Sequence, residues 1–167
     1  MDSIYDSIKQ QALETVKKCT ELGLKISTAE SCTGGMVSAA ITSIPGSSSV
    51  IELGVCSYSN RIKREVLGVS EQTLEKFSEY STQCAEEMAK GALKLSGADF
   101  AVATSGVAGP SGGTEENPVG TVYISVCGKD LTLTQKHVFE NRGRDDIRAA
   151  ATEKALSMLL EIINKLL

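Results

Sequence analysis

The chain has 167 residues, of which 41% are hydrophobic and 23% are charged, a composition typical of an ordinary globular protein. Its length suits one core, so we expect a single domain over residues 1–167. The net charge of −4 repels a phosphate backbone and the 4% aromatic content leaves few rings for base stacking, so we expect no nucleic acid as a partner. No apolar run approaches the roughly 18 residues that span a bilayer, so we expect no membrane partner.

Five cysteines are spread along the chain without a C-x-x-C pair, at positions 19, 32, 56, 84 and 127. Their odd number and wide spacing fit reduced thiols better than a disulfide or zinc framework. The first residues, Met1 to Ser3, lack the basic and apolar regions of a signal peptide. The sequence therefore predicts a cytoplasmic protein without a metal site.

Apolar periodicity and glycine punctuation predict the elements of the first half of the chain. Apolar residues recur at steps of three or four up to Gly23, which predicts an amphipathic helix. Glycines at 34 and 35 then predict a tight turn between a strand and a helix. In order, we expect a helix over 3–22, a strand over 25–29, a helix over 36–41, a loop over 45–49, a strand over 50–59 and a short helix over 60–67.

The second half is predicted to contain a helix, three strands and a long final helix. Ser81 is suited to cap a helix that stops at Gly97. Residues 106–118 hold too many glycines and prolines for a regular element, and loops of that length often carry function. We expect strands over 100–103, 120–127 and 131–139, the last two forming a hairpin, and a helix over 145–167.

This order of elements predicts an α/β fold. We expect a three-layer α/β/α sandwich with a mostly parallel sheet and an antiparallel hairpin at one edge. Ligands of such sheets bind where strands end in loops, and both glycine-rich loops follow predicted strands. The sequence therefore places a candidate site between these loops.

The run at residues 28–35, TAESCTGG, offers a nucleophile at a strand-to-helix junction. Free backbone N–H groups at a helix N-terminus stabilise developing negative charge, so Ser31 or Cys32 could act there. The run is neither a G-x-S-x-G elbow nor a Walker A loop. Helix capping by Ser31 and Thr33 accounts for the same residues, so the motif alone leaves both interpretations open.

A serine nucleophile needs a base, and the one histidine, His137, lies in an alternating strand far from any loop. Lys63 can serve if burial or its neighbours Arg61 and Arg64 lower its pKa from about 10.4; a solvated helix face explains the same cluster. A second basic group could bind a phosphate or pair with neighbouring aspartates, and comprises Arg142, Arg144 and Arg148.

Six segments together resemble the CinA C-terminal domain family, in order and spacing, over nearly the whole chain. They are residues 28–35 (TAESCTGG), 45–48 (PGSS), 58–60 (YSN) with Lys63, 67–69 (LGV), 106–113 (GVAGPSGG) and 117–122 (NPVGTV). The resemblance implies a nicotinamide-nucleotide amidase, similar to the stand-alone form, that hydrolyses nicotinamide mononucleotide to nicotinate mononucleotide and ammonia in pyridine nucleotide recycling. It further implies a homodimer and no metal or organic cofactor.

The resemblance also implies residue roles. Ser31 is the nucleophile and Lys63 its base, with Tyr58 and the hydroxyl of Ser105 in support. Ser105 stands where the family often has threonine, and residues 140–142 (ENR) replace a more usual Gly-Asp-Arg. The residues expected to bind the mononucleotide are Thr33, Gly34, Gly35, Gly106, Gly109, Gly112, Gly113, Arg142 and Arg148.

Two other functions stay open at this point. A nucleotide-binding regulatory module of the same family would bind the ligand without releasing ammonia. A thiol-based redox protein would use Cys32, but no partner cysteine is close in sequence.

Overall fold

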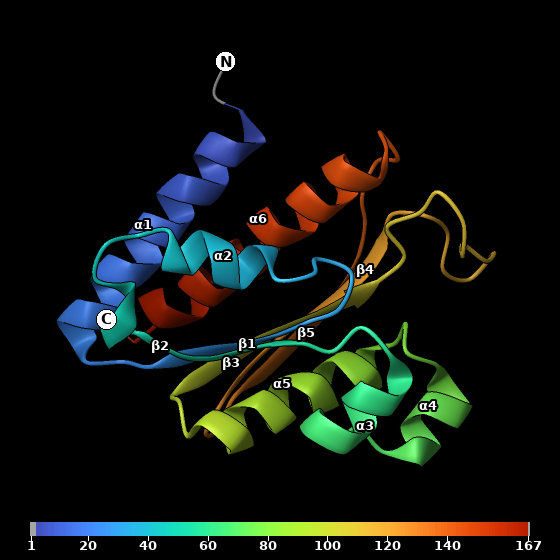
Figure 1. Ribbon diagram of the computed structural model, residues 1–167, viewed down its shortest axis with the longest axis horizontal. Helices are drawn as coiled ribbons and strands as arrows, with labels where there is room; N and C mark the ends of the chain where they lie inside the picture. The colour runs from blue at the N-terminus through green and yellow to red at the C-terminus, as the bar shows by residue number, and fades with distance from the viewer. Residues whose placement is uncertain (1–2, 167) are drawn as a thin grey trace.

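The computed structural model describes residues 3–166, with a five-stranded sheet between two layers of helices (Figure 1). Met1, Asp2 and Leu167 lie outside the described residues. They include two of the three N-terminal residues that we expect to lack signal-peptide features, and the last residue of the predicted final helix. The elements are α1 (Ile4–Leu22), β1 (Ile26–Glu30), α2 (Met36–Thr42), the 3-10 turn η1 (Ser47–Ser49), β2 (Ile51–Cys56), α3 (Asn60–Leu67), α4 (Glu71–Phe77), α5 (Thr82–Ser96), β3 (Phe100–Gly106), β4 (Thr121–Gly128), β5 (Thr132–Val138) and α6 (Arg144–Asn164).

The sheet has the strand order β2-β1-β3-β4-β5. β1 pairs in parallel with both β2 and β3, whereas β4 pairs antiparallel with β3 and with β5. β4 therefore runs against the other four strands, and the β4–β5 hairpin forms one edge of the sheet. This confirms the predicted α/β fold with a mostly parallel sheet and an antiparallel hairpin at its edge.

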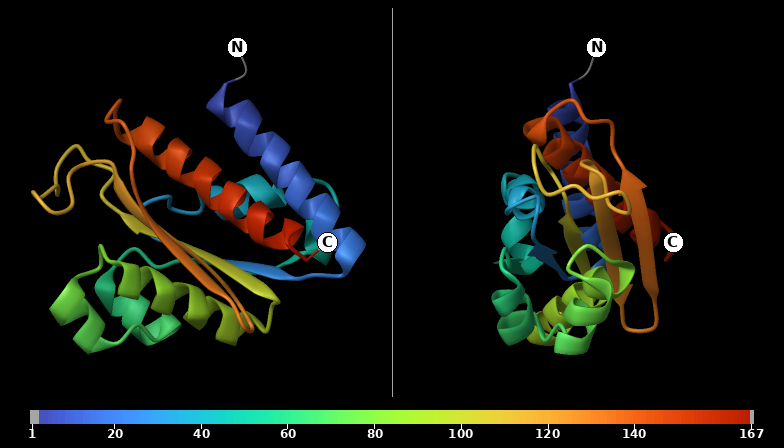
Figure 2. Two further views of the ribbon diagram at one scale, coloured as in Figure 1. Left: turned by 180° about the vertical axis from the view of Figure 1, so that it is seen from behind. Right: turned by 90° about the vertical axis from the view of Figure 1, so that its right-hand side faces the viewer.

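Helices α1, α2 and α6 cover one face of the sheet, and α3, α4 and α5 cover the other (Figures 1 and 2). Successive strand side chains point to opposite faces, so the sheet contributes to two cores. Ile26, Val102 and Ile124 pack among α1, α2 and α6, whereas Ala29 and Ala103 pack against α5. Within residues 3–166, no helix is both long and apolar enough to cross a membrane.

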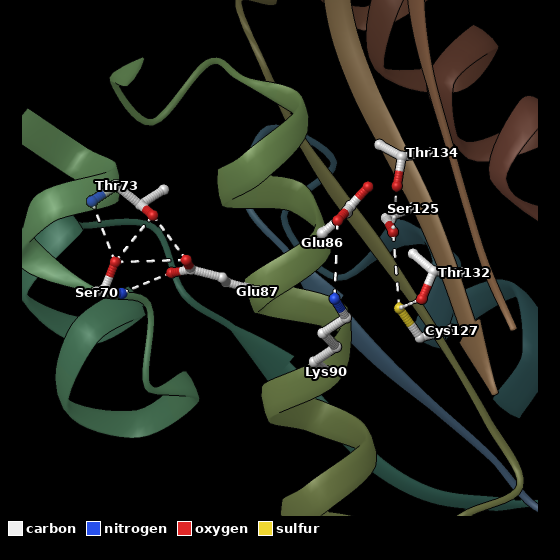
Figure 3. A network of polar contacts seen from close by, with 9 residues as sticks. All are labelled: Ser70, Thr73, Glu86, Glu87, Lys90, Ser125, Cys127, Thr132 and Thr134. Atoms are coloured by element: carbon white, nitrogen blue, oxygen red, sulfur yellow. Dashed lines mark hydrogen bonds and ion pairs between the residues drawn. The ribbon is translucent and has the colours of Figure 1, made fainter. Parts of the chain in front are cut away.

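Helix α4 was not predicted, and its N-terminus is held by a residue distant in sequence. The Ser70 hydroxyl accepts from the Thr73 N–H at 3.1 Å, as an N-cap does. The Glu87 carboxylate, on α5, accepts from the Ser70 N–H and from the Thr73 hydroxyl, each at 2.6 Å (Figure 3). A seven-residue helix is marginal alone, so this contact with α5 stabilises it.

Helices α3 and α5 cross closely at Gly91. A Cβ atom at this position would lie 2.7 Å from the carbonyl carbon of Leu67 and closer still to its oxygen. Such a separation is far below ordinary carbon–carbon contact, so only glycine lets α3 lie this near α5. The crossing fixes the position of α3, the helix that carries Lys63.

Candidate active site

The loop that carries Ser31 leaves the carboxyl end of β1 between two neighbouring strands. The Ser31 N–H donates to the carbonyl oxygen of Thr104 at 2.9 Å, and the Ser57 N–H donates to that of Glu30 at 2.8 Å. Both bonds extend the parallel ladders just past the end of β1. The backbone of Ser31 is therefore held by the sheet, and its side chain is buried, with 7% of the residue exposed.

Lys63 points from α3 to Ser31. Its Nζ lies 3.0 Å from the Ser31 Oγ, 2.9 Å from the carbonyl oxygen of Ser57 and 3.5 Å from that of Tyr58. Only 1% of Lys63 is exposed. This burial lowers the pKa of Lys63 below its usual value, although neighbouring groups, Cys84 first among them, favour the charged form.

Tyr58 meets Lys63 through its backbone, not through its ring. Its side chain is exposed, and the phenol oxygen accepts from Nη2 of Arg144 at 2.8 Å. Ser105 is buried, and its hydroxyl donates to the carbonyl oxygen of Glu79 at 2.7 Å. Ser105 thus fixes the segment between α4 and α5 and forms no hydrogen bond to Ser31 or Lys63 within residues 3–166.

The glycine-rich loop at residues 106–118 is tied to the same region by Arg144. Nη1 of this arginine donates to the carbonyl oxygen of Gly109 at 2.7 Å, so one guanidinium joins the loop to Tyr58. Gly106 lies against β4, where a Cβ atom would come within 2.6 Å of the Cα of Val122. The remaining two candidate glycines of this loop, Gly112 and Gly113, are exposed.

The loop after Ser31 is held from inside the protein. Gly34 and Gly35 have φ values of 60° and 97°, left-handed conformations that glycine adopts without strain. Nε and Nη2 of Arg148 donate to the carbonyl oxygens of Cys32 and Thr33, each at 3.1 Å. The Thr33 hydroxyl is buried and donates to Oε1 of Glu30 at 2.7 Å, so it faces the interior of the loop.

Glu30, which the sequence reasoning did not single out, occupies the N-terminus of α2. Its carboxylate accepts from the backbone N–H groups of Val37 at 2.8 Å and Ser38 at 3.0 Å. The expectation that the N–H groups at this helix start are free is therefore wrong for these two. A carboxylate at the end of an otherwise uncharged strand, followed by a short glycine-containing loop and a helix, is the sequence signal that could have identified it.

Arg142 lies apart from this cluster. Its side chain is exposed and pairs with Glu140 at 2.6 Å, and it lines a cavity of about 370 Å³ together with Ile4 and Phe139. Of the three arginines in the basic group, the structure brings Arg144 and Arg148 to the two glycine-rich loops, and Arg142 to Glu140.

Cys32 is 5% exposed, and burial raises the pKa of its thiol to about 12. The thiol is therefore protonated at neutral pH, which disfavours it as a nucleophile beside Ser31. Burial also raises the pKa of Cys84, on α5, to about 12. Neither thiol has the lowered pKa typical of a reactive or redox-active cysteine.

This fold and geometry define an α/β protein with a buried serine–lysine pair at the carboxyl ends of neighbouring parallel strands. The sequence model of the CinA C-terminal domain matches residues 8–163. The chain therefore belongs to the CinA C-terminal domain family.

Relatives and solved structures of the family agree with this membership. A CinA-like protein of Shewanella amazonensis is 47% identical over 142 residues, which are 85% of this chain and 34% of that protein. A protein of Shewanella oneidensis named nicotinamide-nucleotide amidohydrolase PncC is 46% identical over 137 residues, 82% of this chain and 32% of that protein. This chain thus spans about a third of the length of the curated relatives it matches. The structure of competence/damage inducible protein CihA from Agrobacterium tumefaciens has a TM-score of 0.92 at 43% identity, and the match covers 95% of this chain and 96% of that one.

Proposed function

We propose that this protein is a nicotinamide-nucleotide amidase, which hydrolyses nicotinamide mononucleotide to nicotinate mononucleotide and ammonia. The observation that carries the proposal is the buried contact of 3.0 Å between Lys63 Nζ and Ser31 Oγ. The name of the Shewanella oneidensis relative supports an amidohydrolase activity for the family. The same proposal includes a cytoplasmic homodimer acting in pyridine nucleotide recycling without a metal or organic cofactor.

The surroundings of Lys63 suit a neutral amine that acts as a base. A neutral amine has two N–H groups and one lone pair, and carbonyl oxygens can only accept. When the amine is neutral, the carbonyl oxygens of Ser57 and Tyr58 can accept its two N–H groups, which leaves the lone pair for the hydroxyl of Ser31; when it is charged, its third N–H donates to Ser31 Oγ. The lowered pKa of Lys63 increases the neutral fraction at physiological pH.

In the proposed mechanism, the Ser31 oxygen attacks the carboxamide carbon as its proton passes to Lys63. The resulting ammonium returns this proton to the leaving nitrogen, ammonia departs and a nicotinoyl ester remains on Ser31. Water, deprotonated by the same amine, then attacks the ester carbon; the bond from this carbon to the Ser31 oxygen breaks, the ammonium returns the proton to that oxygen, and nicotinate mononucleotide leaves. The Cys32 N–H directly follows the nucleophile and donates to no backbone carbonyl oxygen within residues 3–166, so it is a candidate donor to the oxyanion.

The 5′-phosphate of the substrate is proposed to bind at the positive side chains between the two glycine-rich loops. Arg144 and Arg148 lie there, whereas Arg142 lies at Glu140. Guanidinium groups bind phosphate through paired N–H donors. Arg144 therefore takes the place that the sequence resemblance gave to Arg142.

The test is to incubate the purified protein with nicotinamide mononucleotide and to follow ammonia and nicotinate mononucleotide. The Ser31→Ala variant is expected to release neither product. Ser27→Ala is the matched control, because Ser27 is also buried on β1 and its hydroxyl makes no hydrogen bond in the described chain; it is expected to retain activity. Saturable nucleotide binding without ammonia from the unmodified protein would instead indicate the regulatory module.

A further inference from the structure

Glu30 is a buried acidic residue that directly precedes the proposed nucleophile, Ser31, in the sequence. It is the last residue of β1, and 1% of it is exposed. Burying a carboxylate is unfavourable unless hydrogen bonds satisfy it. The proposed mechanism gives this carboxylate no proton to transfer, so its retention in the core calls for another role.

The two carboxylate oxygens of Glu30 bridge the Ser31 loop and the start of α2. Oε1 accepts from the Thr33 hydroxyl at 2.7 Å and from the Val37 N–H at 2.8 Å. Oε2 accepts from the N–H and the hydroxyl of Ser38, at 3.0 Å and 2.9 Å. Four donors on both sides of the two glycines therefore converge on one side chain.

Helix α2 depends on this carboxylate for its cap. Its N-cap residue is Gly35, which has no side chain to accept from the first N–H groups, and the helix has only seven residues. The two left-handed glycines give the loop little stiffness of its own. Glu30 thus supplies from the strand what a serine or aspartate cap ordinarily supplies from the loop.

The geometry points to Glu30 as a positioning residue that holds the Ser31 loop so that Ser31 Oγ stays at hydrogen-bond distance from Lys63 Nζ. This inference rests on the proposed function, in which Ser31 is the nucleophile. The sheet fixes Ser31 through its backbone N–H, and Glu30 fixes the chain that follows it.

The bonding pattern requires two acceptor oxygens, as a carboxylate provides. The N–H groups of Val37 and Ser38 can only donate, and each uses a different oxygen. Glutamine has one oxygen, so Glu30→Gln sets an NH2 group against one of these N–H groups. A buried mismatch of this kind shifts the loop, and a displacement of about 1 Å at a reacting group can lower the rate by roughly 100-fold.

The experiment compares Glu30→Gln with the unmodified protein in kcat and KM for nicotinamide mononucleotide and in the rate at which a fluorophosphonate probe labels Ser31. We expect kcat and the labelling rate to fall together, by about 10- to 100-fold, with KM changed by less than about twofold. Glu87→Gln is the matched control, because Glu87 also caps a short helix, α4, and its hydrogen bonds within residues 3–166 go to Ser70 and Thr73 (Figure 3). It is expected to lower thermal stability and to leave kcat and labelling unchanged.

A folded Glu30→Gln protein with wild-type kcat and labelling would overturn the inference, as would an equal loss in Glu87→Gln. If Glu30→Gln does not fold, Thr33→Val removes one of the four donors with little change in shape, and unchanged kcat and labelling in that variant would overturn it as well. Slower labelling of Glu30→Gln in a protein that releases no ammonia would support the positioning role and refute the amidase activity.

Discussion

Replacing Gly91 by alanine tests whether the close crossing of α3 and α5 sets both stability and the site. In an isolated helix this change is favourable by about 1 kcal/mol, because alanine has the higher helix propensity. In this protein the added methyl group would lie 2.7 Å from the carbonyl carbon of Leu67, about 1 Å inside ordinary contact. We therefore expect the sign of the effect to reverse.

The size of the effect follows from what must move. Leu67 meets the new methyl group with its backbone, so no side-chain rotation relieves the overlap and α3 has to shift. Overpacking of this kind costs about 3 kcal/mol at the upper end of the usual range, which leaves a net destabilisation of about 2 kcal/mol after the gain in propensity. For a chain of this length, that corresponds to a fall in Tm of about 4–8 °C.

Thermal unfolding followed by circular dichroism measures this shift, and ammonia release measures the displacement of Lys63. We expect Gly91→Ala to lower both Tm and kcat, because α3 carries the proposed base. Lys90→Ala is the control on the same helix, since Lys90 is exposed and its i,i+4 pair with the half-buried Glu86 is worth at most about 0.5 kcal/mol (Figure 3). A Tm of Gly91→Ala equal to or above that of the unmodified protein would refute the reasoning.

Three further predictions concern the site. Burial lowers the pKa of Lys63, so kcat should rise with pH through that lowered pKa and reach its plateau below the ordinary lysine pKa of about 10.4. Between the folded and unfolded pKa values, Lys63 is protonated in the unfolded chain and neutral in the folded protein, so the free energy of unfolding, measured with urea, should also rise with pH. Lys63→Met should remove this rise in stability. Arg144→Met should raise KM for the mononucleotide by about tenfold through loss of a charged hydrogen bond, whereas Arg142→Met should leave KM unchanged, and steady-state kinetics distinguishes the two. Iodoacetamide should modify the exposed Cys56 before the buried Cys32, as peptide mass spectrometry can show, and early modification of Cys32 would contradict its burial.

Elements whose ends are marked locally were predicted from the sequence. Ser3 and Gly23 bound α1, and Ser81 and Gly97 bound α5, because caps act within one turn of the residues they satisfy. Helix α4 was missed because part of its cap comes from Glu87, 17 residues away from Ser70. No local pattern carries that information.

The candidate site was predictable only as a set of residue types. The motifs identified Ser31 and Lys63, which are 32 residues apart in the sequence. They meet because β2 pairs in parallel with β1, so both strands end at the same edge of the sheet. Whether Lys63 is buried depends on how α3 packs, and this packing is not encoded near Lys63. The choice between Arg142 and Arg144 likewise depends on where α6 begins relative to the loop at residues 106–118.

The serine–lysine contact joins two layers of the molecule, because Ser31 directly follows strand β1 whereas Lys63 belongs to helix α3. Helix α3 packs through Leu67 into the core that α5 covers. An opening that detached α3 and left the sheet intact would expose the amine to water and restore its ordinary basicity. The protein would then lose its proposed base while most of its amide hydrogens stayed protected from exchange. Activity would accordingly be limited by the free energy of this local opening, which native-state hydrogen exchange along α3 measures directly, and not by the free energy of global unfolding.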